Sequence, residues 1–401
     1  MTHSERFNAI CTQLRAYADL WGDSPFCDQQ LAWQHRHPTL SNALLALNDE
    51  QVESLEQDPD QLKFFLGEQL PSLNSLWPLL QIVTDYRQVS LPSHWSTDVP
   101  GRKWAQIAAF MAQLNDHHDT QGSHNSAAMF VDWCAGKSHL GQNVSALLRQ
   151  PLRAIEKDRN LCEVGSAQAK KRELPVEFVC SDVLHEAHCF APEEHVLALH
   201  ACGDLHRRLL DQWVRSQSHA LTLSPCCYHL WLKSSLRPLS SHARAHDLCL
   251  DKNQVQLAVQ ETVTSSTRVR QQVDTLAQWR LSFDVLQRQV RGVDQYLNTP
   301  SLRLSILNDG FVSFIHHLCE HRSIELPSSI DYSWLEEAGK QRFARAKRLQ
   351  LVRHGFRRAL ELWLVLDLVL FLEEHRAKVQ LVEFCPRELT PRNLLIQANR
   401  S

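Results

Sequence analysis

The chain has 401 residues, of which 43% are hydrophobic and 22% are charged. This composition is typical of a globular protein with a large core and excludes a disordered chain. The formal net charge is −3, so the chain lacks an overall basic field, and any surface for nucleic acid has to be local. The longest apolar run, residues 362–372, contains Asp367 and is too short to span a bilayer. The polar start of the sequence predicts no secretory signal, and we expect the 12 cysteines to be reduced in a cytoplasmic protein.

Residues 1–100 have the periodicity of amphipathic helices and contain no chemical motif. Helices are predicted at 40–57 and 60–70, a linker at 92–100, and a further helix at 103–114. The acidic residues between 49 and 60 most simply form a solvated helix face. We therefore expect an N-terminal helical region over 1–100, whose contacts the sequence does not indicate.

The pattern changes at residue 129, where a buried strand (129–133) is followed by a turn and a helix (140–148). A strand, a tight turn and a helix N-terminus form a common seat for nucleotide-like ligands, because small residues let the ligand approach free backbone N–H groups. The turn contains Gly136 and Gly141 but lacks the dinucleotide GxGxxG spacing, and the strand carries an acid, Asp132. An acid at this point suits S-adenosylmethionine (SAM), whose sulfonium and ammonium groups are cations, better than it suits a pyrophosphate.

Four more strands alternate with helices after this turn. They are predicted at 151–156, 176–182, 195–200 and 220–224, and this alternation indicates a parallel sheet with helices on both faces. Glu156 and Asp182 lie at the carboxyl ends of the second and third strands, where ligands of open α/β sheets bind. We expect Glu156 to hold ribose hydroxyls and Asp182 to contact an adenine amino group.

The rest of the chain is predicted to be helical as far as residue 376 and then to end in a hairpin. Helices are predicted at 254–260, 268–289, 311–321, 335–348 and 356–374, and strands at 379–385 and 393–397. A hairpin of this size is not stable alone, so it most simply completes the earlier sheet. The plan is α/β, a seven-stranded Rossmann-like sheet of the class I SAM-dependent methyltransferase type. Its predicted segments are an N-terminal helical region (1–100), a SAM-binding core (101–230), a helical insertion (231–376) and the hairpin (377–401).

Four short motifs resemble those of a methyltransferase-domain family. Residues 131–140 (VDWCAGKSHL) resemble its "vDxGxGkGhL" motif, residues 199–205 (LHACGDL) and 224–229 (SPCCYH) match "lHaCGdL" and "xPCCyH", and residues 389–394 (LTPRNL) are similar to "lSPRNl". Its members include the methyltransferase-like proteins of vertebrates, the glutathione S-transferase C-terminal-domain-containing protein and, more distantly, eukaryotic tRNA 2′-O-methyltransferases. The resemblance extends from about residue 100 to the end. It implies SAM as the cofactor and, through the tRNA-modifying relatives, RNA as the substrate.

Two positions depart from the family motif. Ser138 stands where the family usually has Gly, and a serine there is tolerated unless its φ is positive. Cys134 replaces the commoner Gly of "DxG", which narrows the methionine end of the expected pocket. Strand ends and resemblance together predict these SAM-binding residues: Asp132, Cys134, Gly136, Lys137, Glu156, Asp182 and His200.

Residues after the fourth and fifth strands should face the methyl acceptor. We predict catalytic roles for Asp204, Cys226 and His229, with Asp204 or His229 as a general base toward a hydroxyl or ring nitrogen. The Pro-Cys at 225–226 is similar to that of cytosine C5 enzymes, although small residues closing a tight loop explain it more simply. The Asn/Asp-Pro-Pro-Tyr/Phe motif of adenine N6 methylation is absent after the fourth strand.

A metal site is the rival interpretation of the same loops. Cys202, Cys226, Cys227 and His229 all follow the fourth and fifth strands. Because adjacent cysteines do not easily bind one zinc ion, for which CxxC is the usual spacing, we expect no metal.

Basic residues supply the candidate substrate contacts. The segment 342–358 holds seven Lys and Arg and no acid, and it is interpreted either as a solvated helix face or as a phosphate-binding patch. The predicted substrate-binding residues are Arg353, Arg357, Arg358, Arg392 and Asn393. The sequence thus predicts a SAM-dependent methyltransferase acting on tRNA or rRNA. A protein or small-molecule methyltransferase, or an inactive SAM-binding module, remains an alternative, and the oligomeric state is not indicated.

Overall fold

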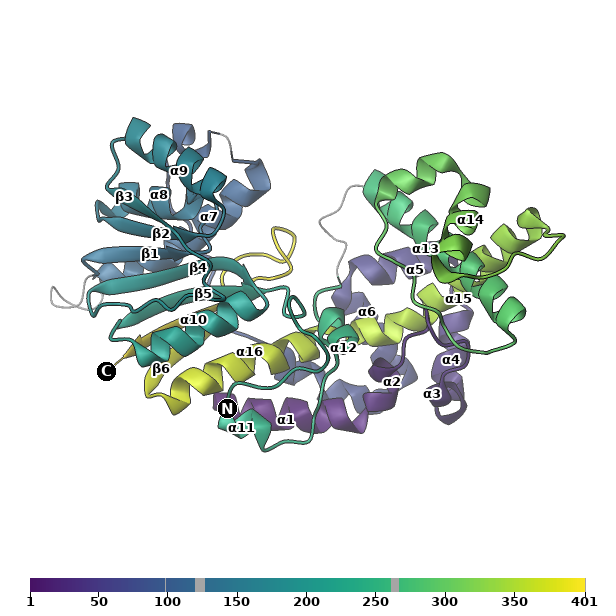
Figure 1. The fold of residues 1–401 in the computed structure, drawn as a ribbon. Coiled ribbons are helices and arrows are strands. Elements are labelled where there is room, and N and C mark those ends of the chain that lie inside the picture. Colours follow the sequence, from purple (N-terminus) through teal and green to yellow (C-terminus); the bar gives the residue numbers. More distant parts are fainter. Residues whose placement is uncertain (98, 120–126, 261–266, 401) are drawn as a thin grey trace. The chain divides into compact units, whose positions relative to one another are not determined.

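A computed structural model describes residues 1–97, 99–119, 127–260 and 267–400. The chain forms two compact units that are interleaved along the sequence (Figure 1). The first unit comprises Met1–Thr12, Leu79–Glu261 and Arg358–Ser401, and the second comprises Gln13–Pro78 and Thr262–Arg357. The division into the segments 1–100, 101–230, 231–376 and 377–401 stays a prediction.

A seven-stranded sheet lies at the centre of the first unit, in the order β3-β2-β1-β4-β5-β7-β6. The strands are β1 (Met129–Trp133), β2 (Leu152–Glu156), β3 (Val176–Cys180), β4 (Glu194–Cys202), β5 (Ala220–Cys226), β6 (Ala377–Glu383) and β7 (Leu394–Arg400). Neighbours from β3 to β5 are parallel, whereas β7 is antiparallel to both β5 and β6. The predicted fold class is therefore confirmed, including the final hairpin.

Helices cover both faces of this sheet because strand side chains alternate between them. Phe130 packs in a core with Leu140 and Val144 of α8 (His139–Leu148) and with apolar residues of α7 (Gly101–Asp119). Trp133, three residues further along β1, points to the opposite face, where its indole N–H donates to the carbonyl of Leu205 in α10 (Asp204–Arg215). The helix α9 (Arg159–Lys171) connects β2 to β3.

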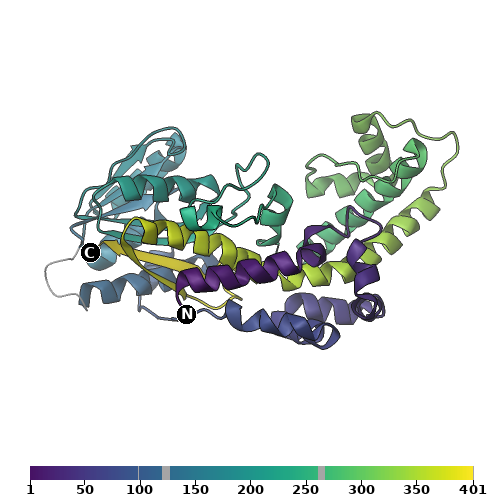
Figure 2. The same ribbon diagram turned by 90° about the horizontal axis from the view of Figure 1, so that it is seen from below.

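Two helices from the ends of the unit lie side by side, α1 (His3–Ala16) and α16 (Arg357–Glu374) (Figure 2). Phe7 of α1 packs on Trp363 of α16 with ring centroids 5.6 Å apart. Asp367, buried in α16, accepts hydrogen bonds from the N–H groups of Leu239 and Ser240 and from the Ser240 hydroxyl. These bonds attach the segment after β5 to α16. That segment contains α11 (Ser241–Arg244) and α12 (Lys252–Leu257), and η3 (Ser93–Ser96) lies in the predicted linker.

The second unit is helical. Its core is formed by α13 (Thr267–Arg291), α14 (Phe311–Arg322) and α15 (Tyr332–Gly355). Gly339 of α15 lies directly against Ser282 of α13, leaving no room there for a side chain. The remaining elements are α2 (Ala18–Gly22), α3 (Ala32–Arg36), α4 (Pro38–Leu45), α5 (Asp49–Gln57), α6 (Pro59–Gln69), η1 (Pro71–Ser75), η2 (Trp77–Leu80) and η5 (Leu304–Asp309).

The single helix predicted over 40–57 is wrong, because the structure has two helices there, α4 and α5. Asn48 interrupts the pattern as an N-cap: its side chain accepts from the Gln51 N–H, and the Gln51 side chain accepts from the Asn48 N–H. This reciprocal capping box starts a new helix. Within the described part of the chain, no helix is long and apolar enough to cross a membrane.

Candidate functional site

The loop between β1 and α8 holds three residues in the left-handed backbone region. They are Cys134, Gly136 and Ser138, with φ of 58°, 59° and 54°. These are the three positions at which the resembled motif has glycine, and the structure supplies the reason: only Gly adopts this conformation without steric cost. A serine was expected to be tolerated at position 138 unless its φ were positive, and the φ of Ser138 is positive. Both non-glycine residues hold the glycine-like loop conformation nonetheless.

Asp132 lies beneath this loop and is 3% exposed. Its Oδ2 accepts hydrogen bonds from the Ser138 hydroxyl at 2.7 Å and from the Gly141 N–H at 3.1 Å. Burial raises the pKa of Asp132 to about 6, although both hydrogen bonds oppose that rise. The carboxyl thus organises the loop and the first turn of α8.

Glu156 joins the end of β2 to the same loop. Its Oε2 accepts from the Gly136 N–H at 2.8 Å, while Oε1 accepts from the N–H groups of Lys157 and Asp158. Parallel pairing of β1 with β2 places the two strand ends at one edge. Two residues predicted to bind SAM are therefore in direct contact.

Cys134 lies where the ends of several strands converge. Burial raises the pKa of its thiol, and Glu156, Asp132, Cys202 and Asp182 add to that rise electrostatically. These four residues come from the ends of four different strands or the loops after them. Asp182 lies just after β3, where its Oδ1 accepts from the Leu184 N–H at 3.1 Å. The structure thus brings the predicted residues of β1, β2 and β3 together at the carboxyl edge of the sheet.

The end of β4 is irregular. His200 has a φ of 60° and interrupts the β4–β5 pairing between Leu199 and Ala201. Its Nε2 lies 3.0 Å from Oε1 of Gln106 in α7. Burial lowers the pKa of His200 to about 4, with further lowering by Arg392 and Lys103, so its imidazole is neutral at neutral pH. Such strained backbone is concentrated at functional sites.

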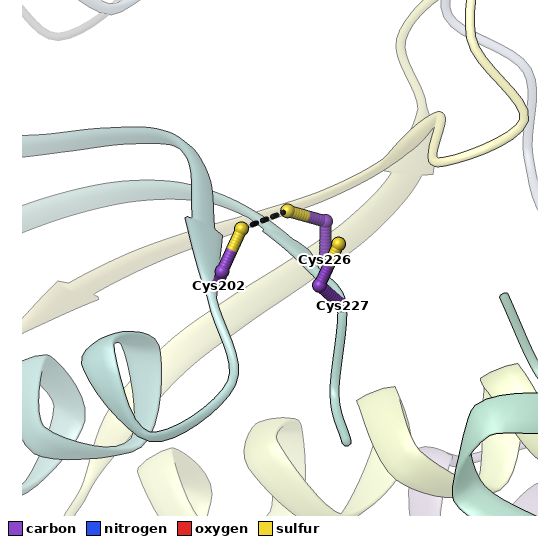
Figure 3. A group of neighbouring side chains, drawn as sticks. All are labelled: Cys202, Cys226 and Cys227. Atoms are coloured by element: carbon purple, nitrogen blue, oxygen red, sulfur yellow. Dashed lines mark hydrogen bonds between the residues drawn. The ribbon is translucent and has the colours of Figure 1, made fainter. Parts of the chain in front are cut away.

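Three cysteine thiols meet at the ends of β4 and β5 (Figure 3). Cys202 pairs with Cys226 across the two strands, and their sulfur atoms are 3.2 Å apart. The sulfur atoms of Cys202, Cys226 and Cys227 all lie within 4.8 Å of one another. Hydrogen bonds from the other two thiols lower the pKa of Cys227 to about 2, whereas hydrogen bonds within the cluster raise the pKa of Cys226, so the cluster favours one thiolate at Cys227.

The three predicted catalytic residues have different environments. Asp204 starts α10 with a side chain that is 45% exposed, 3.7 Å from the guanidinium of Arg207. Cys226 is 4% exposed. Burial lowers the pKa of His229, and its buried Nδ1 has no hydrogen-bond partner in the part of the chain that the structure describes. Cys226 is thus closed to a large acceptor, whereas Asp204 and His229 are both partly exposed.

The predicted substrate-binding arginines of the 342–358 segment are used inside the protein. Arg353 is 5% exposed and donates to the carbonyl of Trp21, within the second unit. Arg358 pairs with Glu361 and Glu383 within the first unit. Other members of the segment make ion pairs with acids that are distant in sequence: Arg342 with Asp284, Lys347 with Glu56 and Asp274, and Arg348 with Asp49. The segment is neither a solvated face nor an open phosphate patch at these residues.

The remaining three predicted substrate-binding residues differ in exposure. Asn393 is 3% exposed, and its amide donates to the carbonyl of Cys385. Arg357 is partly buried at the start of α16. Arg392 is partly buried in the loop before β7, and its guanidinium donates to the carbonyl of Val259.

Sequence reasoning missed residues that reach the site from outside the motifs. Gln106 contacts His200, and Lys103 acts electrostatically on both Asp132 and His200. Both lie on α7, upstream of the strand–turn motif, and their spacing of three residues on a predicted helix was the available signal. Lys252, at the start of α12, acts on His229.

Comparison with known proteins identifies the domain. Residues 102–234 match the model of a family described as a methyltransferase domain. No curated protein is significantly similar to the chain. The matched residues contain β1 to β5 and all of the predicted SAM-binding and catalytic residues.

Parts of the chain are also similar to solved structures of methyltransferases. The tRNA (uracil-54, C5)-methyltransferase of Pyrococcus abyssi, in complex with S-adenosyl-L-homocysteine, is 13% identical over 29% of this chain and 28% of its own, with a TM-score of 0.23. A SAM-dependent methyltransferase from Aquifex aeolicus is 14% identical over 34% and 72%, with a TM-score of 0.26. Coclaurine N-methyltransferase is 14% identical over 56% and 58%, also with a TM-score of 0.26. The chain thus spans little more than a quarter of the first of these proteins.

The family match and the sheet topology agree. Residues 102–234 form the domain of a SAM-dependent methyltransferase, and SAM is its cofactor.

Proposed function

We propose that the protein transfers a methyl group from SAM to RNA. The observation that carries this proposal is the set of cations around the ends of β4 and β5, where the methyl acceptor would lie. Lys103, Lys252 and Arg392 come from three separate segments, and each acts electrostatically on His200 or His229. A local group of cations on a chain with a net charge of −3 is the arrangement expected for a polyanionic substrate.

The loop after β1 fits SAM. A Cβ built on Gly136 would meet nothing within 4 Å, so there is open space beside its backbone. The carboxylates of Asp132 and Glu156 border this loop and match a ligand with cationic groups and ribose hydroxyls. In this proposal Asp132, buried beneath the loop, attracts the ammonium group electrostatically, Glu156 binds the ribose, and Asp182 contacts the adenine. Bound SAM supplies a methyl group on a sulfonium, which an acceptor removes by in-line displacement.

Asp204 is the residue that we propose accepts the proton of the substrate. It is the first residue of α10, directly after the turn that follows β4, and its carboxylate is more exposed than the thiol of Cys226 or the Nδ1 of His229. Proton transfer to a positioned side chain contributes about 10²–10⁴-fold to a rate. A ring nitrogen with a free lone pair needs no base, so dependence on Asp204 distinguishes a hydroxyl acceptor from such a nitrogen.

The proposal does not depend on the basic segment 342–358. Arg353 and Arg358 already make a hydrogen bond and an ion pair, respectively, within their own units. The candidate RNA contacts are instead Lys103, Lys252 and Arg392, because the first two are exposed and Arg392 lies in the loop before β7, near His200 and His229.

Transfer of radiolabelled methyl groups tests the proposal. The purified protein is incubated with labelled SAM and with separate pools of tRNA, rRNA and soluble protein from cells lacking its gene. We expect nuclease-sensitive label in an RNA pool, and loss of most of it in the double variant Lys103→Gln, Lys252→Gln. The matched control is Lys378→Gln, which removes an exposed lysine at the start of β6, at the opposite edge of the sheet. Label found only in protein would contradict the proposal, as would a loss of RNA label in Lys378→Gln equal to that in the double variant.

A further inference from the structure

The ends of β4 and β5 carry a feature that methyl transfer to RNA does not require. Three of the 12 cysteines converge there, and two of the three are adjacent in sequence. Free cysteines are common in protein cores, but they usually contact apolar side chains rather than one another. Among the residues that the structure describes, this is the one group of three or more His, Cys, Asp or Glu side chains close enough to share a metal ion.

The backbone explains how adjacent cysteines can face the same point. Successive side chains of an extended strand point to opposite faces, so Cys226 and Cys227 would diverge if β5 simply continued. Cys227 has a φ of 46°, which takes it out of the extended conformation. Its sulfur atom consequently lies within 4.8 Å of the other two (Figure 3). The obstacle that adjacent cysteines ordinarily present to a shared metal ion is therefore absent at this pair.

The end of the neighbouring strand, β4, also departs from extended geometry. The interruption at His200 precedes Cys202, and Gly203 follows with a φ of 51°. Gly203 approaches the backbone of Leu230 so closely that a Cβ would lie 2.4 Å from the Leu230 carbonyl oxygen. Two loops are thus held against each other in strained conformations, and such strain persists only where the surroundings stabilise it.

The distances suit a tetrahedral ion bound by thiolates. Zinc binds sulfur at about 2.3 Å, so two ligand sulfurs in a tetrahedral site are about 3.8 Å apart. The separation of the Cys202 and Cys226 sulfurs is 3.2 Å, and no pair in the cluster exceeds 4.8 Å. Side-chain shifts of less than about 1 Å would therefore convert the cluster into a three-thiolate site.

His229, two residues along the chain, can supply a fourth ligand once its side chain turns toward the cluster, because its ring nitrogens lie outside the group of three sulfurs that are within 4.8 Å of one another. The Nδ1 of His229 is buried and has no hydrogen-bond partner among the described residues, which is a costly state for an imidazole nitrogen. The imidazole is also close enough to Cys227 for the two groups to interact electrostatically. Metal coordination satisfies this nitrogen as a hydrogen bond would.

We propose that Cys202, Cys226, Cys227 and His229 bind one zinc ion that holds the loops after β4 and β5 together. Soft thiolate ligands with one imidazole select zinc over calcium or magnesium. Three thiolates and one Zn²⁺ leave a single net negative charge, which Lys252 and Arg392 lie near enough to offset. The ion is structural, because all four coordination positions are filled by the protein. This inference is independent of the identity of the methyl acceptor.

Zinc content tests the proposal without any measurement of activity. The full chain is reduced, incubated with Zn²⁺, desalted and analysed by mass spectrometry for metal. We expect one zinc per chain in the wild type, and at least about tenfold weaker binding in His229→Ala. The double variant Cys202→Ser, Cys226→Ser should lose the metal. Cys249→Ser, which changes an exposed cysteine outside the cluster, should keep it. A wild type without zinc, or a double variant that keeps it, would overturn the proposal.

A second measurement uses the unmodified protein, because the double variant could fail to fold. Co²⁺ replaces zinc in tetrahedral thiolate sites and gives intense sulfur-to-cobalt charge-transfer absorption. We expect this absorption on adding Co²⁺ and its loss on adding Zn²⁺. Only the weak spectrum of six-coordinate Co²⁺ would contradict the site. A mass lower by two hydrogens in protein that has been reduced and then exposed to air, with no metal bound, would show a Cys202–Cys226 disulfide and would also contradict it.

Discussion

Replacing Asp132 with Asn should stabilise the protein while damaging its site. Burial raises the pKa of Asp132 from 3.8 to about 6, which is about two units. At 1.36 kcal/mol per unit, the buried carboxylate costs about 3 kcal/mol of folding free energy at pH 8. The asparagine side chain in Asp132→Asn would resemble the neutral acid in shape. It could still accept a hydrogen bond from the Ser138 hydroxyl, whose oxygen is 2.7 Å away in the wild type.

The sign of the pH dependence follows from linkage. Because the folded-state pKa is raised, the folded state binds more protons than the unfolded state between about pH 4 and pH 6. The buried carboxylate therefore lowers the wild type's free energy of unfolding least below pH 4. This loss grows as the pH rises to 6 and then stays constant. We expect Asp132→Asn to gain roughly 1–2 kcal/mol at pH 5 and about 3 kcal/mol at pH 8.

Urea unfolding, followed by tryptophan fluorescence at both pH values, measures this difference. The variant should also bind SAM more weakly, since the carboxylate is what the proposed ammonium contact requires. A variant less stable than the wild type at pH 8, or a difference that is equal at pH 5 and pH 8, would refute the reasoning about the buried charge.

Five other substitutions test four parts of the structure. Cys134→Gly should raise the free energy of unfolding by about 1 kcal/mol, because a non-glycine residue is removed from the left-handed region. Ser138→Gly should raise it by less, since this change also deletes a buried hydrogen bond. Equal increases in the thermal midpoints of the two variants would contradict this reasoning. Lys103→Gln should reduce the slope of log RNA affinity against log salt by about 1 in filter binding, and an unchanged slope would exclude a phosphate contact. Arg358→Gln should cost roughly 3 kcal/mol in urea unfolding because two carboxylates lose their partner; a cost below about 1 kcal/mol would mean that the pairs are solvated. Asp367→Ala should lower the free energy of unfolding by about 2–4 kcal/mol, because three donors, two of them buried, lose their acceptor. A variant as stable as the wild type would show that water replaces the carboxylate.

The sheet and the convergence of residues at its strand ends were predictable because their signals are local. Buried apolar runs mark each strand, and the parallel order places strand ends at one edge. The contact between Glu156 and Gly136 follows from that order alone. The final hairpin was predictable because two short strands at the end of a chain need an existing sheet.

Backbone conformation was not visible in the sequence. The positive φ values at His200 and Cys227 have no sequence signal of the kind that glycine provides, yet they decide where the cysteine side chains point. The same limit explains why adjacent cysteines were judged unable to share an ion.

Long-range pairing was equally hidden. A basic segment without local acids predicts solvent or phosphate contacts, but the partner of Arg342 is Asp284 and that of Arg348 is Asp49. The interleaving of the two units also depends on contacts between distant segments. The capping box formed by Asn48 and Gln51 has a local sequence signal. It was missed because the apolar periodicity over 40–57 continues across it and predicts a single helix.

Calorimetric titration with SAM tests the central claim most directly, namely that the ends of β1, β2 and β3 form a SAM site. The comparison uses the wild type, Glu156→Ala and the control Glu163→Ala, which changes an exposed glutamate on α9. We predict one SAM bound per wild-type chain, unchanged affinity in the control, and roughly tenfold to hundredfold weaker binding in Glu156→Ala, because hydrogen bonds to a charged acceptor are lost. A wild type that does not bind SAM, or a Glu156→Ala variant that binds it as tightly as the control, would contradict the claim.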